Sequence, residues 1–506
     1  MNRPAARRSP SEADSGRRTA AQNGREERPG GDGSRDGSRA GRGRPERPER
    51  PQSPSERPDR SRSRRDRPER AGDAVGTRIE VEVGPPGHGG FCVARHEGRA
   101  VFVRHALPGE RVVAVVTEGD AKDSFWRADA VEVLAASEDR VEPPCEYAGP
   151  GRCGGCDWQH VAYEAQLRLK GQVVEEQLRR LAKLDREVVV EEVGSPFGWR
   201  TRVQFAVDAD GQLGFRKHRS HEVVPVEECA IASAGVDEVG ALQRDWPGME
   251  TVEVIAATGS ADRALVVTPH RGEQMPYVDA DVKVSVLRGV SRNTHISGVQ
   301  RIHGRPYVRE VAEGRTWRVS GSGFWQVHPA APDVLTEAVL DFLEPAAGEV
   351  ALDLYCGVGL FAVPLAEAVG EDGAVLAVEL DRQAIKDAAH NLGFEEDVEE
   401  SAEFPWVDLV EGSVDEVLAD DGYVPDQADV VVLDPPRAGA GREVCARIAA
   451  LAPRAVAYVA CDPAALARDV AYFADAGYEL IDLRAFDLFP MTRHVECVAL
   501  LEPVQR

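Results

Sequence analysis

The sequence contains no run of 18 or more apolar residues, which is about the length that a membrane-spanning helix needs. It also has no apolar segment after the arginine pairs Arg7-Arg8 and Arg17-Arg18, which argues against export. Only nine cysteines occur among 506 residues, and their uneven spacing does not suggest a disulfide framework. We therefore expect a cytoplasmic protein without a membrane partner, whose cysteines are thiols, metal ligands or catalytic groups.

Positive charge is scarce outside the N-terminus. The chain has a net charge of −25, yet residues 1–75 carry 20 arginines against 13 acidic residues. An acidic body is unusual for a protein that binds nucleic acid, because phosphate contacts need local positive charge. Residues 1–75 also hold almost no apolar side chains, so we expect a disordered tail. This tail either contacts nucleic-acid phosphates or only keeps the chain in solution.

Two patterns follow the tail. Short alternating strands, such as Ile79–Val83 and Glu110–Val116, predict a small β-barrel of the oligonucleotide-binding type over residues 76–137. Residues 138–325 are mixed, with a helical stretch near Tyr163–Leu184 and a strand at Arg200–Val207. We expect an α+β middle domain there.

Residues 326–506 alternate apolar strands with helical stretches. The expected strands are Val350–Leu354, Ala374–Glu379, Val407–Glu411, Ala428–Leu433, Arg454–Ala460, Glu479–Phe486 and Val495–Leu501. This alternation predicts an α/β fold, a doubly wound Rossmann-like domain whose ligands bind beyond the carboxyl ends of its strands.

A glycine turn follows the first of these strands. Gly357 and Gly359 let the backbone pass close to a ligand, and Glu379 ends the next strand, where a carboxylate accepts hydrogen bonds from ribose hydroxyls. By itself this pattern is also typical of a dinucleotide site. The segment Asp434–Arg437 favours a site for a flat base beside the cofactor over a dinucleotide site. An acidic residue followed by two prolines forms a rigid shelf on which such a base can lie.

Cys461 directly follows a predicted buried strand, and Asp462 and Pro463 suit the N-cap and first turn of the next helix. A thiol at a helix N-terminus lies in partial positive charge, so we expect a lowered pKa and a reactive thiolate. An inert buried thiol is the alternative for any single cysteine, but the position beside the predicted cofactor site favours catalysis.

One reaction that needs such a reactive cysteine is the methylation of uracil at C5. C5 is a poor nucleophile towards a methyl sulfonium, whereas addition of a thiolate to C6 creates an enolate with electron density on C5. A separate base then has to remove the C5 proton before the thiolate leaves. Glu496, where a loop enters the last strand, is the candidate base, with His494 as its rival.

Four segments in order carry a resemblance: 353–362, 433–439, 458–463 and 489–496 look like the RNA 5-methyluridine methyltransferase family, which acts on tRNA or 23S rRNA. The stretch around Gly87–Gly90 is similar to a TRAM domain, so the resemblance covers all but the tail. It implies S-adenosylmethionine as methyl donor, Cys461 as nucleophile and Glu496 as base. The residues that it implies for the S-adenosylmethionine site, together with the two glycines of the turn, are Gln326, Tyr355, Glu379, Asp434, Gly357 and Gly359.

The chain departs from the family pattern at three positions. Asp462 stands where Asn is usual, His328 follows Gln326 where Asn is common, and Leu360 replaces an Asn of several relatives. These departures concern the details of cofactor contacts and leave the reaction unchanged.

Four further cysteines suggest a metal centre: Cys145, Cys153, Cys156 and Cys229. Zinc and iron–sulfur clusters both use four thiolates, and spacing alone does not choose between them. The rRNA-directed relatives carry a 4Fe–4S cluster on a similar arrangement, so the resemblance implies that cluster and favours 23S rRNA over tRNA. The loop between the first two cysteines is about two residues longer than usual.

The sequence thus predicts a barrel, a cysteine-clamped middle domain and a methyltransferase domain, acting as a monomer on an RNA base that is turned out of its stack. Two alternatives remain open at this point. A nicotinamide-dependent iron–sulfur oxidoreductase accounts for the glycine turn and the cluster but leaves Asp434 and Cys461 unexplained. A non-catalytic RNA-binding protein is the other.

Overall fold

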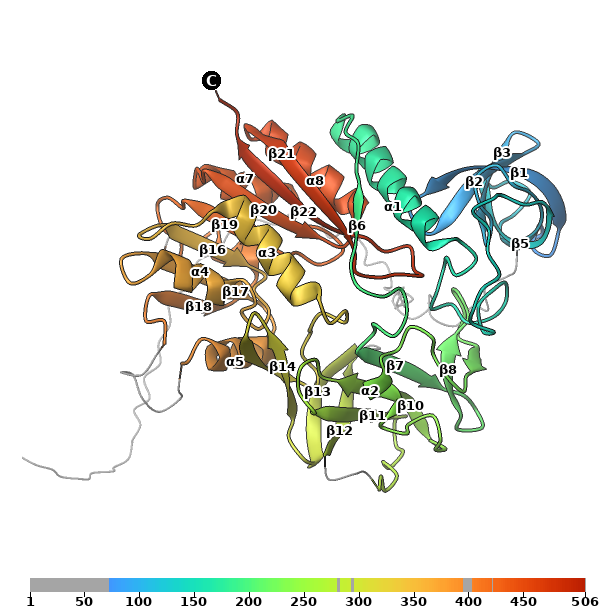
Figure 1. Cartoon of the computed structure of the whole chain (residues 1–506), viewed down its shortest axis with the longest axis horizontal. Helices are drawn as coiled ribbons and strands as arrows, with labels where there is room; N and C mark the ends of the chain where they lie inside the picture. Colours follow the sequence, from blue (N-terminus) through green and yellow to red (C-terminus); the bar gives the residue numbers. More distant parts are fainter. Residues whose placement is uncertain (1–71, 280–282, 293–294, 395–402, 421, 506) are drawn as a thin grey trace, which may run out of the picture. The chain divides into compact units, whose positions relative to one another are not determined.

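The computed structural model describes residues 72–279, 283–292, 295–394, 403–420 and 422–505. Within these ranges the strands form a closed five-stranded barrel, a seven-stranded sheet, a two-stranded hairpin and an eight-stranded sheet (Figure 1). Nearly all of the predicted tail, residues 1–71, lies outside the described residues. In the same ranges, no helix has both the length and the apolar character needed to cross a membrane.

The barrel confirms the small β-barrel predicted from short alternating strands. Its order is β1-β2-β3-β5-β4, and β1 pairs with β4 to close it. Along β1, Ile79, Val81 and Val83 point into the barrel while the residues between them are exposed, which is the period of two that a half-buried strand requires. The strands are β1 (Arg78–Gly87), β2 (Phe91–His96), β3 (Arg99–Arg104), β4 (Arg111–Glu118) and β5 (Phe125–Ala135).

The middle sheet has the order β13-β12-β11-β10-β7-β8-β9 and packs its apolar face around Trp246, which is 1% exposed. Its strands are antiparallel except for the pair β11 and β12. The elements are β7 (Arg202–Val207), β8 (Leu213–Arg216), β9 (Val223–Pro225), the short helix α2 (Ala234–Asp237), β10 (Met249–Ala256), β11 (Arg263–Pro269), β12 (Val284–Arg292) and β13 (His295–His303).

The C-terminal sheet has the order β18-β17-β16-β19-β20-β22-β21-β6. The chain runs outwards from β16 to β17 and β18, then returns to β19 on the other side of β16, so the switch point of a doubly wound sheet lies between β16 and β19. This confirms the predicted fold class. Its strands are β6 (Val190–Glu192), β16 (Val350–Leu354), β17 (Ala374–Glu379), β18 (Val407–Glu411), β19 (Val430–Leu433), β20 (Ala455–Ala460), β21 (Tyr478–Asp487) and β22 (Glu496–Pro503).

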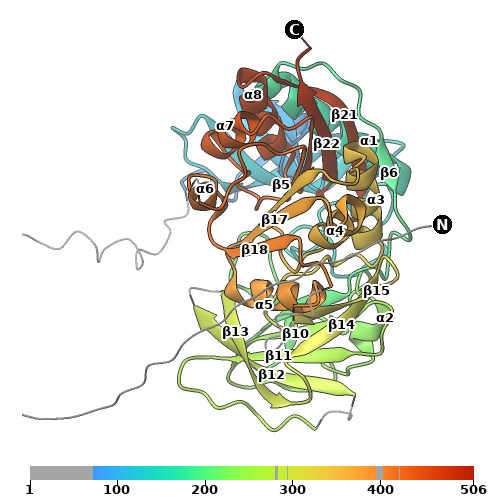
Figure 2. The same cartoon turned by 90° about the vertical axis from the view of Figure 1, so that its left-hand side faces the viewer.

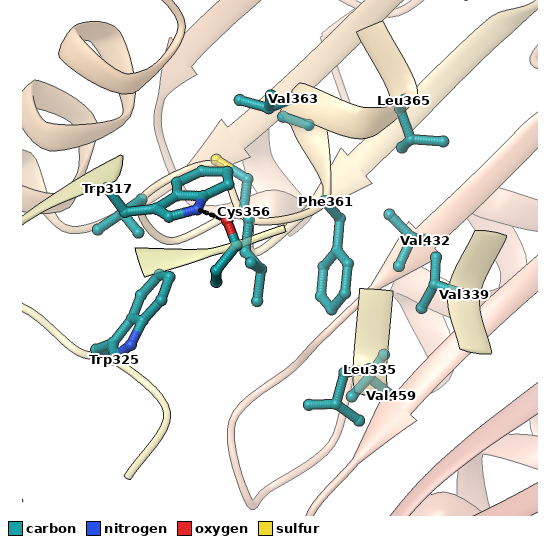
Figure 3. Packing of buried hydrophobic residues seen from close by; sticks show 14 of the residues in the cluster. Trp317, Trp325, Leu335, Val339, Cys356, Phe361, Val363, Leu365, Val432 and Val459 are labelled. Atoms are coloured by element: carbon teal, nitrogen blue, oxygen red, sulfur yellow. Dashed lines mark hydrogen bonds between the residues drawn. The ribbon is translucent and has the colours of Figure 1, made fainter. Parts of the chain in front are cut away.

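Helices cover both faces of this sheet (Figure 2). Val459 of β20 packs with α3 and α4, whereas Tyr458 packs with α7 and α8, so successive residues of one strand serve two cores. Figure 3 shows the first core, where Trp317 and Trp325 lie near Phe361. The helices are α3 (Ala331–Leu343), α4 (Ala362–Val369), α5 (Arg382–Asn391), α6 (Val414–Val417), α7 (Arg442–Ala450) and α8 (Pro463–Asp475).

Parts of the stretch before residue 326 also belong to the C-terminal sheet. Strand β6 pairs with β21, and Figure 1 shows it in green beside the red strands. Lys170, fully buried, donates to Asp487 Oδ1 at 2.5 Å and to the Phe489 carbonyl at 3.1 Å. The other elements before residue 326 are the helix α1 (Tyr163–Gln177), the π-helical turn η1 (Leu178–Ala182) and the two strands of the separate hairpin, β14 (Tyr307–Ala312) and β15 (Arg315–Ser320).

Candidate active site

Strand register brings the predicted site residues to one edge of the C-terminal sheet. Leu354 pairs with Leu433, and the Asp434 N–H donates to the Leu354 carbonyl at 3.2 Å. The Cys356 N–H likewise donates to the Val378 carbonyl, next to Glu379. The glycine turn, Glu379 and Asp434 therefore meet beyond the carboxyl ends of β16, β17 and β19, where doubly wound sheets bind ligands.

The glycine turn leaves open space beside its backbone. Gly357 has φ +57°, and a Cβ on it would meet nothing within 4 Å; Gly359 has φ +92°. Glu379 Oε2 accepts a hydrogen bond from the Gly357 N–H at 3.0 Å, which holds the turn against β17. Asp353 of β16 is fully buried, and the backbone of Ala362 at the start of α4 is the hydrogen-bonding neighbour of its carboxyl group.

Carboxylates gather at this edge and shift one another's protonation. Burial, then Asp434, raises the pKa of Asp353 well above its usual range. Burial, then Glu379, raises the pKa of Asp434 to about 7. A cluster of acids that cannot all ionise in a site of low polarity is well suited to binding a ligand that brings positive charge.

The last two residues predicted for the cofactor site are Tyr355 and Gln326. Tyr355 has φ +66° and packs against the core on the α7–α8 face; burial raises its pKa to about 12. Gln326 is 9% exposed and lies in the segment between β15 and α3. Just before that segment, the last residue of β15 contacts α5: the Ser320 N–H donates to Asp387 Oδ2 at 2.8 Å.

A buried carboxylate anchors the loop that follows Asp434. Asp469 of α8 is fully buried, and its Oδ2 accepts from the N–H groups of Ala440 and Gly441 at 2.7 and 3.2 Å and from the Tyr458 hydroxyl at 2.8 Å. The loop that carries the two prolines is therefore fixed at its far end by a residue of the helix that begins beside Cys461.

Cys461 and Glu496 lie side by side. Ala460 pairs with Cys497 in the antiparallel register of β20 and β22, so the next position along brings Cys461 opposite Glu496. Asp462 caps α8, as predicted: its Oδ1 accepts from the N–H groups of Ala464 and Ala465 at 3.0 and 2.9 Å. Glu496 is 3% exposed, and burial, then Asp434, raises its pKa well above the usual range, with Arg437 opposing.

The expectation of a lowered pKa for Cys461 is wrong. Burial, then the neighbouring carboxylates Glu496 and Asp434, raises the pKa of this thiol to about 11. Arg437 lowers the pKa by less than these groups raise it. The helix N-terminus is present, but burial of the thiol, then the two neighbouring acids, outweighs its effect on the pKa. In the free pocket the thiol is therefore protonated at neutral pH.

This raised pKa predicts how Cys461 reacts with a small alkylating agent. Only the thiolate is nucleophilic, so the rate at Cys461 should rise about tenfold per pH unit from pH 7 to pH 9. Peptide mass spectrometry after timed exposure to iodoacetamide measures the rate at this residue alone. In the urea-unfolded chain the thiol regains a pKa of about 8.5, so the rate there should level off earlier. A plateau by pH 8 in the folded protein would contradict the raised pKa.

The rival base, His494, is nearly uncharged in this site. Burial, together with the arginines around it, lowers its pKa to about 3. Its ring packs edge-on against Phe489 at 5.9 Å between centroids. A group with so low a pKa accepts protons poorly near neutral pH, which favours Glu496 as base.

One cavity of about 320 Å³ is lined by the four cysteines that the sequence suggests as a metal centre, together with Arg200. These cysteines are Cys145, Cys153, Cys156 and Cys229. Burial raises the pKa of Cys153 to about 11 and of Cys156 to about 12, and nearby cysteines add to both. In the part of the chain that the structure describes, no group of three or more His, Cys, Asp or Glu side chains is arranged to hold a metal ion.

Sequence reasoning missed several residues around Cys461. The pocket that contains this thiol is also lined by Arg437, Arg493 and a turn of the barrel, Gly87–Gly90. The sequence indicates only that this turn is similar to part of a TRAM domain. Nothing local in the sequence indicates that the turn lies against residues some 370 positions later. We call this cavity the nucleophile pocket and residues 87–90 the barrel turn.

Two family models match the chain. The model described as tRNA (uracil-5-)-methyltransferase matches residues 307–504, and the TRAM domain model matches residues 73–130. The first match contains Asp434, Cys461 and Glu496; the second contains most of the barrel.

Similar proteins match over most of their length. A Streptomyces coelicolor protein described as an uncharacterised RNA methyltransferase is 56% identical over 445 residues, 85% of this chain and 94% of that protein. A Bifidobacterium longum protein with the same description is 39% identical over 431 residues, 81% of this chain and 93% of that protein. The structure of Pyrococcus abyssi tRNA (uracil-54, C5)-methyltransferase, in complex with S-adenosyl-L-homocysteine, shares the fold. It has a TM-score of 0.62 and 23% identity, covering 83% of this chain and 99% of that chain.

Proposed function

The chain belongs to the tRNA (uracil-5-)-methyltransferase family of RNA methyltransferases, and from that premise we propose that it methylates uracil C5 in RNA through a covalent adduct on Cys461. The observation that carries the proposal is the pair formed by Cys461 and Glu496 at the carboxyl edge of the C-terminal sheet, beside Asp434. A nucleophile and a base are the two groups that this chemistry needs.

The residues of the glycine turn fit S-adenosylmethionine. Space is open beside Gly357, where a Cβ would meet nothing within 4 Å, and the acids Asp353, which is buried, and Asp434 lie at the same edge of the sheet. The cofactor would be held by the backbone at Gly357 and Gly359, by Glu379 at its ribose hydroxyls and by Tyr355, Asp434 and Gln326 around them. Bound S-adenosylmethionine supplies an electrophilic methyl group and is left as its neutral thioether. The acidic surroundings suit its sulfonium charge.

The chain's own residues perform the other steps. The Cys461 thiol gives up its proton to solvent, and the thiolate so formed adds to uracil C6, forming the S–C6 bond and moving the C5=C6 electron pair towards C5 and the O4 enolate. Once C5 carries the methyl group, the Glu496 carboxylate takes the C5 proton. The electrons of that C–H bond re-form C5=C6, and the thiolate leaves. A carboxylate with a raised pKa holds such a proton well.

Two RNA classes are candidates for the substrate. We favour 23S rRNA, because the arrangement of the four cysteines resembles that of the rRNA-directed relatives. The family description and the solved Pyrococcus abyssi relative name tRNA, which is the second candidate. The base has to leave its stack, since a stacked base cannot reach both Cys461 and the methyl donor.

Nucleoside mass spectrometry tests the function and names the substrate together. We would purify tRNA and 23S rRNA separately from a deletion strain and its parent and measure 5-methyluridine in each. Loss from the rRNA alone supports the favoured substrate, and loss from the tRNA alone supports the second. If both fractions kept all their 5-methyluridine, and purified protein restored none to unmodified RNA of either class, the proposed reaction would be wrong.

We further propose that the cysteine cavity holds a 4Fe–4S cluster. Four thiols around about 320 Å³ provide both the ligands and the volume that a cluster needs, and a cluster is wider than the single ion that three converging side chains hold. Arg200, which is half-buried and lines the same cavity, supplies positive charge against the thiolates. The methyl transfer needs no electrons, so the role of the cluster is to fix the middle domain.

Anaerobically purified protein is expected to contain about four iron and four sulfide per chain. Cys153→Ser should lose most of both, whereas Cys445→Ser, a buried cysteine on α7, should lose neither. One zinc without sulfide would favour the alternative metal, and no metal in protein that retains its fold would rule out the centre.

A further inference from the structure

The nucleophile pocket is small and has one wall that the methyltransferase domain does not supply. It encloses about 50 Å³, and the barrel turn lines it together with Cys461, Arg437 and His494. This volume has room for only a few water molecules. A pyrimidine ring is larger than this volume, so the lining has to move before a base can enter.

His88 of the barrel turn contacts the residue next to the nucleophile. Its Nε2 lies 3.0 Å from Asp462 Oδ2, while Asp462 Oδ1 caps α8. Burial alone would raise the pKa of Asp462, but the His88 hydrogen bond and the two cap N–H groups lower it to about 2, so it is a carboxylate at neutral pH. One side chain thus joins the barrel to the helix that begins directly after Cys461.

A second contact joins the barrel turn to the segment that leads to Glu496. Arg493 Nη1 donates to the Gly89 carbonyl at 2.7 Å, and the Arg493 N–H donates to the buried Asp157 Oδ2 at 3.4 Å. Gly90 permits this approach, because a Cβ there would lie 2.9 Å from Arg493 Cδ. The barrel turn therefore touches both catalytic segments, one beside the nucleophile and one beside the base.

We propose that the barrel turn is a working part of the catalytic pocket: His88 is a positioning residue that acts on the nucleophile segment through Asp462, and the turn determines the size of molecule that reaches Cys461. RNA that binds the barrel also contacts the element that has to move before a base enters. The identity of that base rests on the proposed function, whereas the restriction of access to Cys461 does not.

Size-selective labelling of Cys461 tests the restriction without RNA or cofactor. The rates of reaction with N-ethylmaleimide and with a bulky pyrene maleimide are measured at Cys461 by peptide mass spectrometry. Their ratio cancels any change in the thiolate fraction, since both reagents meet the same thiolate. His88→Ala should raise the bulky-to-small ratio at least about tenfold, the equivalent of one hydrogen bond to a charged group. His88→Gln, which can still donate to Asp462, should raise it less.

His96→Ala is the matched control. This histidine belongs to the same barrel, but its ring lies 6.2 Å from Trp126 and does not line the nucleophile pocket. Its ratio should equal that of the parent protein. An unchanged ratio in His88→Ala, with the fold intact by circular dichroism, would overturn the proposed restriction.

Methylation kinetics then test the positioning role. His88→Ala should lower kcat about tenfold with little change in KM for RNA, and His88→Gln should recover part of kcat. A rise in KM alone would overturn that role and make His88 an RNA contact. If the parent protein methylates no RNA while the labelling ratio responds to His88→Ala, the proposed function fails and the access restriction stands.

Discussion

Replacing Cys461 by alanine is expected to lower the rate of RNA methylation by at least about 10⁴-fold. Without the thiolate, C5 of uracil acquires no negative charge, and neither the cofactor site nor Glu496 can compensate. The residue is half-buried directly after β20, and its sulfur makes no hydrogen bond within the described residues, so the substitution should leave the fold intact. Transfer of tritiated methyl groups to unmodified RNA measures the rate.

Cys445→Ala provides the comparison. Cys445 is also buried, but it lies on α7 in the core of the opposite face of the sheet. This variant should keep the activity of the parent to within about twofold and lose only some stability to the small cavity. Activity above one per cent of the parent in Cys461→Ala, with no other cysteine labelled by RNA, would mean that the methyl transfer does not use this nucleophile.

Replacing Glu496 by glutamine is expected to arrest the reaction after methyl transfer. The adduct forms and C5 receives its methyl group, but the C5 proton stays, so the thiolate cannot leave. Turnover should fall about 10² to 10⁴-fold, the range for loss of a general base, while a covalent protein–RNA complex accumulates. The substitution also removes a carboxylate that raises the pKa of Cys461, so adduct formation should not slow. A denaturing gel detects the complex, and mass spectrometry of the nuclease-trimmed adduct locates it.

Glu502→Gln, on the same strand β22 but at its other end, should turn over normally and give no complex. The complex should also be absent from the double variant that lacks Cys461. If His494→Ala accumulated the complex and Glu496→Gln did not, the two roles would be exchanged, and the pKa of about 3 for His494 would have to rise when RNA binds.

The sequence predicts the C-terminal sheet well because its central strands are buried on both faces. Such strands read as short apolar runs, and Val350–Leu354 and Ala374–Glu379 begin and end where the pattern places them. The cap of α8 is similarly local, since Asp462 and the N–H groups that it accepts from are neighbours in the chain. Features fixed within a few residues are therefore available from the sequence alone.

Features that depend on distant pairing are not available in this way. The lowered pKa expected for Cys461 followed from its helix, but burial by the surrounding fold, then Glu496 and Asp434 from distant parts of the chain, raise the pKa instead. Strand β6 spans only Val190–Glu192, too short to give a periodic signal, and it is a strand because β21 offers an edge. His88 reaches Asp462 across 374 residues, and no local pattern indicates that contact.

The ion pair between Lys170 and Asp487 has a consequence for the order in which the chain is made. The two residues are 317 positions apart, so at about 5 to 20 residues per second the ribosome produces the second roughly 15 to 60 s after the first. Until then α1 has neither the counter-charge for its lysine nor the strand beside which β6 lies. Glu496 is made later than Asp487, so a nascent chain still lacks its proposed base when this ion pair first becomes possible. A chain that has not yet reached Glu496 should therefore not complete the proposed methylation of the RNA around it.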